Sequence, residues 1–254
     1  RGDLPAALQA YERVALPELD PGRAALYVEE AWTRYRQGDL VGAMADLNTI
    51  EAPSFRNEFI PDRYILRALI FRRLCHFLPA RRALREFNRR YANAVQTIRQ
   101  RTELTRDEEL RRAALLRGAA RRASDFLELL ERESDLLTRH SSDFGPRLHE
   151  QLARTYAVAR AEAKRVLELR LDEAIENEAD RLLVADEQIE LLDYEVGLRI
   201  YERIQENPDA PALPEDDALS PGQVSFPFAG EFWNDELRSF EFVANNRCKE
   251  GELE

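Results

Sequence analysis

The side chains that could carry out catalysis form no recognisable catalytic group in this sequence. The three histidines, His76, His140 and His149, stand in no spacing that is typical of a metal site. Acid pairs such as Glu108 and Glu109 are adjacent on a predicted helix, so they point to different faces and cannot share a substrate. The sequence also lacks a glycine-rich phosphate loop and a nucleophile-elbow motif. These features predict a protein that is not an enzyme and that uses no cofactor, metal or small-molecule substrate.

Arginines give the strongest concentration of charge. The 254 residues carry a net charge of −11, yet residues 63–122 contain 17 arginines and only 5 acids. A nucleic-acid-binding protein would use such a block to contact phosphates, and this is the alternative function that the sequence leaves open. The acidic remainder of the chain should repel nucleic acid. Several of these arginines are also expected to lie on the solvent-exposed sides of a helix. A protein partner is therefore favoured over nucleic acid.

Three ten-residue stretches with a common pattern indicate how the first part of the chain is built. They are GDLPAALQAY from Gly2, GDLVGAMADL from Gly38 and CHFLPARRAL from Cys75. Each places a small residue, a large apolar residue and another apolar residue at spacings of four and three: Ala7, Tyr11 and Val14; Ala43, Leu47 and Ile50; Ala80, Leu84 and Phe87. This is one stripe of a helix. Partner helices are predicted over residues 25–37 and 61–74, so the repeat of 36 to 37 residues predicts stacked helix pairs.

These stretches resemble the tetratricopeptide repeat family, with units near residues 1–20, 23–52 and 59–91. Gly38 falls at the turn of that motif, Ala43 at its small packing position, and Tyr27 and Ala31 at positions of its first helix. The third unit departs from the family by placing Cys75 where glycine is usual. The resemblance implies an all-α helical solenoid with a concave peptide-binding groove. Carried over residue by residue, the groove would comprise Val28, Trp32, Tyr35, Arg36, Asp62, Ile65, Leu69, Arg72 and Arg73.

A second region, residues 105–207, is predicted to form a long antiparallel coiled-coil hairpin. Thr105 begins a sequence with capping-box spacing, and apolar residues then alternate at spacings of four and three from Leu116 to Leu137 and again from Leu148 to Leu169. Residues 140–145 read as the turn, with Pro146 in the first turn of the next helix. Helical spacing persists to Ile204, so the second arm either runs on as one continuous helix or returns to the repeats after a kink near Glu178. Such an arm could space the repeats or form a homo-oligomer.

The last region, residues 208–254, combines a linker rich in proline and acids with an aromatic tail. The tail contains Phe226, Phe228, Phe232, Trp233, Phe240 and Phe242, and we expect it to dock in cis on its own chain. If it folds back over the repeats, Cys75 at a partly accessible turn and Cys248 could form a disulfide. Two unrelated reduced thiols remain the alternative.

Together these features predict a non-catalytic scaffold that binds a peptide or a partner protein. Repeats joined to long helices, with a tail of the GEFWNDEL kind, are similar to proteins of bacterial envelope and gliding-motility assemblies. No window approaches 18 consecutive apolar residues, so no membrane-spanning segment is predicted. The chain begins at Arg1 within the first repeat, so we expect a segment to precede it. The compartment stays open, with the periplasm or cell envelope favoured over the cytoplasm.

Overall fold

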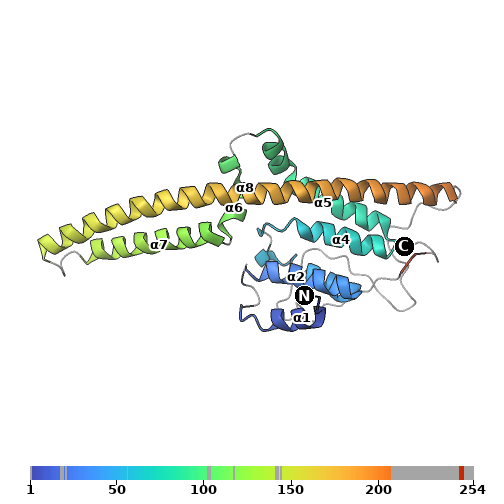
Figure 1. The fold of residues 1–254 in the computed structure, drawn as a ribbon, viewed down its shortest axis with the longest axis horizontal. Helices are drawn as coiled ribbons and strands as arrows, with labels where there is room; N and C mark the ends of the chain where they lie inside the picture. Colours follow the sequence, from blue (N-terminus) through green and yellow to red (C-terminus); the bar gives the residue numbers. More distant parts are fainter. Residues whose placement is uncertain are drawn as a thin grey trace. The chain divides into compact units, whose positions relative to one another are not determined.

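A computed structural model describes residues 2–17, 20, 22–55, 57–101, 104–116, 118–140, 143, 145–206 and 246–248. Every regular element in these ranges is helical, which confirms the all-α prediction (Figure 1). The α-helices are α1 (Leu4–Glu12), α2 (Arg23–Gln37), α3 (Leu40–Thr49), α4 (Asp62–Arg73), α5 (Phe77–Arg99), α6 (Glu108–Leu115), α7 (Gly118–Arg139) and α8 (Pro146–Glu206). Two short 3₁₀ turns, η1 (Pro53–Phe55) and η2 (Leu104–Arg106), lie between them.

The chain divides into two compact units. The first unit combines residues 1–92 with residues 184–254, and the second comprises residues 93–183. The predicted repeat region ended at residue 91. The last third of α8 also belongs to this unit, and a return of this segment to the repeats was one of the two courses left open. Among the described helices, none is both long and apolar enough to cross a membrane.

In the first unit, the same turn precedes α1, α3 and α5. Gly2, Gly38 and Cys75 have positive φ angles of 126°, 85° and 58° at this turn. The residue that follows each of them caps the next helix, and the Asp3 and Asp39 side chains accept hydrogen bonds from Ala6 N and Gly42 N. A positive φ costs a residue with a Cβ about 1–2 kcal/mol, so Cys75 occupies a position that favours glycine.

The predicted packing stripe is buried in two of its three copies. Ala43, Leu47 and Ile50 are buried in α3 and the residue after it, and Ala80, Leu84 and Phe87 are buried in α5. In the first copy, Ala7 and Tyr11 are half-buried, and Val14 is exposed. The prediction for Val14 was wrong because α1 ends at Glu12, so Val14 no longer shares a helical face with Tyr11.

The last third of α8 lies against α4 and α5 in the first unit. Its inner row, Ala185, Ile189, Leu192 and Val196, is buried. Two ion pairs lie at the edges of this contact. The Arg72 guanidinium of α4 lies 3.0 Å from the Glu195 carboxylate, and the Arg81 guanidinium of α5 lies 3.4 Å from the Asp193 carboxylate. This part of α8 therefore continues the core of the repeat unit.

The second unit starts its helices at different residues from those predicted. Asp107, rather than Thr105, caps α6, since its carboxylate accepts a hydrogen bond from Leu110 N at 3.0 Å. Thr105 lies instead inside the 3₁₀ turn η2. Leu110 and Ala113 are buried on the inner face of α6. Gly118, with a φ of 78°, begins α7, so the predicted apolar row from Leu116 is interrupted there.

Within this unit, α7 and the first part of α8 lie side by side (Figure 1), and the Tyr156 hydroxyl donates a hydrogen bond to the Glu133 carboxylate at 3.0 Å. On α7 the inner residues are those of the predicted row: Ala120, Ala123, Leu127, Leu130, Ser134 and Leu137. On α8 the predicted row holds for Leu152, Ala159 and Val166, whereas Leu148 and Leu169 at its ends are exposed. Tyr156 and Ala163 complete the inner row, in which small alanines allow close helix approach.

Of the two courses left open for residues 146–206, the structure shows the continuous one. Helix α8 runs unbroken for 61 residues. At Glu178, where a kink was the alternative, the carboxylate is bound by Arg181 of the next turn at 3.0 Å. Pro146 stands at the first position of α8, where its missing N–H leaves no hydrogen bond unmade.

Candidate interaction surface

A row of alternating guanidinium groups and aromatic rings lies on α2 and the end of α4. The Trp32 and Tyr35 rings meet edge to face, with centroids 5.9 Å apart. The Arg36 guanidinium lies 5.9 Å from the Trp32 ring centroid, and the Arg73 guanidinium lies 5.6 Å from that of Tyr35. We call Trp32, Tyr35, Arg36 and Arg73 the Arg–aromatic row. Cation–π contacts hold the guanidinium planes in place, while their N–H donors stay able to bind carboxylates.

The structure separates the nine predicted groove residues into three groups. Trp32, Tyr35, Arg36 and Arg73 form the Arg–aromatic row. Asp62 and Leu69 are half-buried on α4, and Arg72 is ion-paired with Glu195 of α8. Val28 and Ile65 are buried, so their assignment to an open groove was wrong. Both are β-branched apolar residues whose helical faces are turned into the core, and Val28 packs in the cluster that contains Leu47 and Leu66.

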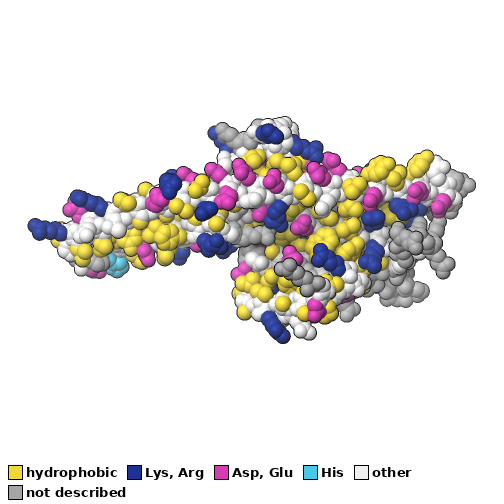
Figure 2. All heavy atoms as spheres, viewed as in Figure 1, with side chains coloured by type: hydrophobic (Ala, Val, Ile, Leu, Met, Phe, Trp, Pro, Cys, Tyr) yellow, Lys and Arg dark blue, Asp and Glu magenta, His cyan; other side chains and the backbone are white. Residues whose placement is uncertain are grey.

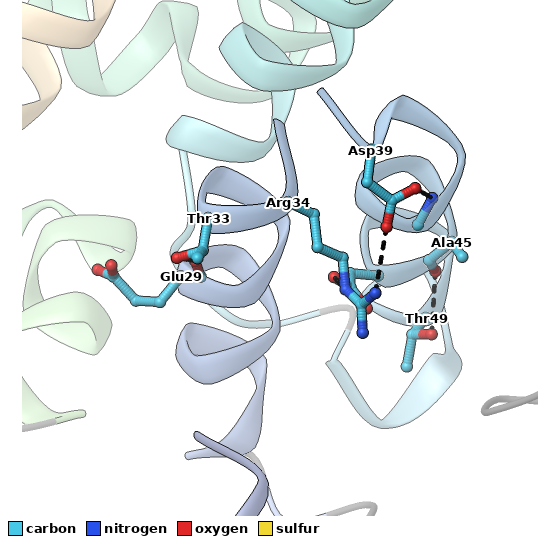
Figure 3. A network of polar contacts seen from close by, with 8 residues as sticks. Glu29, Thr33, Arg34, Asp39, Ala45 and Thr49 are labelled. Carbon is cyan, nitrogen blue, oxygen red and sulfur yellow. Dashed lines mark hydrogen bonds and ion pairs between the residues drawn. The ribbon is translucent and has the colours of Figure 1, made fainter. Parts of the chain in front are cut away.

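Polar contacts between α2 and α3 support the helix that carries this row (Figure 3). Arg34 of α2 reaches Asp39, the residue that caps α3, at 3.3 Å and Asp46 of α3 at 3.0 Å. The Thr33 hydroxyl donates to the Glu29 carbonyl oxygen at 2.8 Å, and the Thr49 hydroxyl donates to that of Ala45 at 3.1 Å. Because Arg34 joins both helices, it fixes the turn that follows the Arg–aromatic row.

Asp46 is the most perturbed carboxyl of this network. Burial raises its pKa to about 7, although the Arg34 charge acts in the opposite direction. The ion pair with Arg34, whose Nε lies 3.0 Å from Asp46 Oδ2, offsets only part of this effect of burial. Burial also raises the pKa of Glu30, which lies one turn before Arg34 on α2. The interior between α2 and α3 therefore disfavours carboxylate charge.

Residues 246–248 are held beside the Arg–aromatic row. Cys75 and Cys248 are joined by a disulfide, with their Cα atoms 5.0 Å apart. Arg247 N donates a hydrogen bond to the Leu74 carbonyl oxygen at 3.0 Å. Cys75 is buried, whereas the sequence predicted a partly accessible turn. Leu74 and Cys75 directly follow Arg73, so Arg247 and Cys248 are anchored next to this row.

Arg203 of α8 was not predicted as a site residue. Its Nη2 donates to the Arg247 carbonyl oxygen at 3.1 Å, and its guanidinium lies 4.9 Å from the Phe77 ring centroid. A signal for it does exist in the sequence. Arg203 follows Ile189 and Val196 at successive spacings of seven, so an arginine stands in the buried apolar row of α8. An arginine in such a row needs partners, and the returning tail supplies one.

The predicted tail-docking residues Phe226, Phe228, Phe232, Trp233, Phe240 and Phe242 lie outside the described residues. Only residues 246–248 of the tail are described, and they hold the contacts given above. Whether the aromatic side chains dock in cis therefore stays a prediction.

Some of the arginines of residues 63–122 are paired with acids or buried, whereas others, such as Arg82 and Arg85 of α5, are exposed. Arg67 binds both Glu51 and Glu86, and Arg112 binds Glu108 and Glu109. Arg63 is buried, with its Nη2 donating to the Tyr64 hydroxyl at 2.6 Å. These arginines are also divided between the two units. The alternative nucleic-acid interface stays a prediction.

The histidines occupy separate environments. His140 Nδ1 lies 3.1 Å from the Asp143 carboxylate, and His76 is buried at the start of α5. Within the described ranges, no three or more histidine, cysteine or acidic side chains are grouped so that they could hold a metal ion.

Comparison of the chain with protein-family models, with curated proteins and with solved structures finds no match.

Proposed function

We propose that this protein is a non-catalytic scaffold of the tetratricopeptide kind, whose Arg–aromatic row binds a peptide that carries aromatic and acidic side chains. The observation that supports this most is the row itself. Its two guanidinium groups are held over two rings within one surface of α2 and α4. Rings offer apolar contact, and guanidinium groups offer paired donors to carboxylates, so together they suit an acidic, aromatic segment.

The chain's own tail has this composition, and we propose that it occupies the row in cis. Residues 207–245 contain eight acids and one arginine, together with the six aromatics of the tail. Their C-terminal end leads into Asn246–Cys248, which is anchored beside Arg73. A tethered segment competes at an effective concentration of the order of millimolar. An external peptide would therefore bind only when it displaces the tail.

A labelled synthetic peptide with the sequence of residues 224–245 tests this proposal. We expect weak or no binding to the full chain, and micromolar binding when Phe232 and Trp233 of the chain are replaced by serine. Adding Trp32→Ala and Arg73→Ala to that variant should weaken binding at least tenfold. Arg82→Ala and Arg85→Ala, two exposed arginines of α5, serve as the matched control. Equal binding to the Arg–aromatic variant and to the control would contradict the proposal.

We further propose that the second unit is an arm for assembly. Phe126, Leu129 and Leu136 are exposed on α7, adjacent to its inner row, and Figure 2 shows a broad apolar area over this helix. An apolar face wider than a two-helix contact requires is typical of a helix that meets a further helix. Sedimentation of the full chain should show an oligomer that Leu129→Ser with Leu136→Ser dissociates. A monomer at all concentrations would restrict the arm to a spacer.

The disulfide bears on where the scaffold works. Disulfides persist in oxidising compartments and are rare in reducing ones. The Cys75–Cys248 bond therefore supports the periplasm or cell envelope as the compartment in which the proposed scaffold operates.

A further inference from the structure

The last third of α8 is apolar on the side that faces away from its own core. Its inner row is buried against the repeat unit, as described above. On the opposite side, six large apolar residues are 42–66% exposed: Val184, Leu191, Tyr194, Leu198, Tyr201 and Ile204. We call these six residues the outer row of α8. Figure 2 shows apolar side chains along the outer edge of α8 towards its C-terminal end.

The spacing of the outer row is that of a helix-docking seam. Val184, Leu191 and Leu198 are seven residues apart, and Tyr194 and Tyr201 repeat the same spacing between them. This is a two-per-heptad pattern over about 30 Å of helix, which matches a partner helix of about 20 residues. A helix that is apolar on both sides is normally buried on both sides. The described residues of the chain cover only one of them.

The charges beside the outer row select the kind of helix that fits. Glu187, Glu190 and Glu202 lie on or next to the row, and Glu202 is paired with Arg199 at 3.1 Å. A second copy of the same helix would bring acids against acids, which costs energy at flanking positions. Residues 207–245, with eight acids and one arginine, are disfavoured on this surface for the same reason. A helix flanked by basic residues is complementary to it.

We propose that the outer row of α8 is a docking surface for an amphipathic helix of a partner protein, whose apolar seam is flanked by arginine or lysine. Six side chains, each about half exposed and of roughly 200 Å² in full, offer on the order of 600 Å² on this chain. A matching partner doubles the buried area to the lower range of stable specific interfaces. This surface is distinct from the Arg–aromatic row, and its proposal does not depend on the function assigned to that row.

A pair of designed peptides tests the proposal on the full chain. Both are 21-residue amphipathic helices with leucine in the heptad seam; one has lysine at the flanking positions, and the other has glutamate. Fluorescence anisotropy should show that the lysine peptide binds at least tenfold more tightly than the glutamate peptide. Leu191→Ser with Leu198→Ser should weaken this binding at least tenfold. Val158→Ser with Leu169→Ser changes two equally exposed residues of α8 in the other unit, and it should leave the binding unchanged.

Three results would overturn the proposal. The first is equal affinity for the two peptides, which would remove the charge complementarity. The second is peptide binding that appears only after Phe232→Ser and Trp233→Ser, which would show that the tail covers the outer row. The third is a dimer that Leu191→Ser with Leu198→Ser dissociates, which would identify a second copy as the occupant. Glu187→Lys adds an independent check, since it should reduce the ratio between the affinities for the lysine peptide and the glutamate peptide.

Discussion

Removing the disulfide should destabilise the first unit by several kcal/mol. The bond joins positions 173 residues apart in the sequence. In the chain-entropy treatment, a cross-link that closes a loop of this length destabilises the unfolded chain by about 5 kcal/mol. Cys75→Ser with Cys248→Ser should therefore lower the free energy of unfolding of this unit by about that amount. Cys75 also has a φ of 58°, which costs about 1–2 kcal/mol in any residue with a Cβ.

A matched variant separates the energetic cost of the positive φ at position 75 from the effect of losing the disulfide. Cys75→Gly with Cys248→Ser removes the same bond but places at position 75 the residue that the left-handed conformation favours. We expect this variant to be more stable than the double serine variant by about 1 kcal/mol. Equal stability of the two variants would show that the turn at Cys75 relaxes once the bond is lost.

Urea unfolding followed by Trp32 fluorescence provides the assay. Trp32 lies in the first unit, and a Trp233→Phe background leaves it as the single tryptophan. With a denaturant slope of about 3 kcal/mol per molar, a loss of 5 kcal/mol moves the midpoint by roughly 1.5 M. Reductant should move the wild-type midpoint to that of the double serine variant and leave the variant unchanged. The reasoning fails if reductant does not move the wild-type midpoint, or if alkylation of folded protein labels both cysteines.

Three further perturbations test other parts of the structure. Gly38→Ala should lower the free energy of unfolding by about 1 kcal/mol, because Gly38 has a φ of 85°. Gly197→Ala, inside α8 and with open space for a Cβ, should raise it by roughly 0.5–1 kcal/mol. Urea unfolding of the two variants should therefore show changes of opposite sign. Asp46 has a pKa of about 7 when folded and 3.8 when unfolded, so stability is full below pH 4 and falls by up to about 4 kcal/mol as the pH rises through 7. Asp46→Asn should then be more stable than the wild type at pH 8 and no more stable at pH 4, and a less stable variant at pH 8 would show that the ionised pair with Arg34 stabilises the fold. Asp107→Ala removes the cap of α6 and should cost about 1 kcal/mol, measured as faster amide exchange at Leu110.

The repeated turn could be read from the sequence because its requirements are local. Glycine at position 38 followed by Asp39 is a combination that a left-handed turn and a helix cap both need, and it recurs at Gly2 and Asp3. The bounds of α2 and α4 were predictable for the same reason. The first helix was harder, since α1 has no buried residue and its stripe ends where the helix ends.

Which side of a helix is buried depends on partners that lie far away in the sequence. Val28 and Ile65 were placed in a groove by analogy, but contacts from other helices turn them into the core. On α8, the apolar residues Leu148 and Leu169 were predicted to face inward but are exposed, while Tyr156 and Ala163, which were not predicted, lie on the inner side. Local spacing could not decide which of these residues face inward, because α8 is apolar on more than one side over most of its length.

Because α8 is apolar on more than one side, we expect charge, rather than apolar area, to decide which segment binds to which surface of the first unit. The first unit exposes two surfaces with aromatic or apolar side chains, and their charges have opposite signs. The Arg–aromatic row presents Arg36 and Arg73, whereas the outer row of α8 is bordered by Glu187 and Glu202. Apolar contact alone would let the aromatic tail settle on either. In the arrangement that we propose, the eight acids of residues 207–245 direct the tail to the Arg–aromatic row, beside which the disulfide holds Cys248, and they leave the outer row to a basic partner. Because exposed charges are screened within about 10 Å at 0.1 M salt, this sorting should weaken as the salt concentration rises.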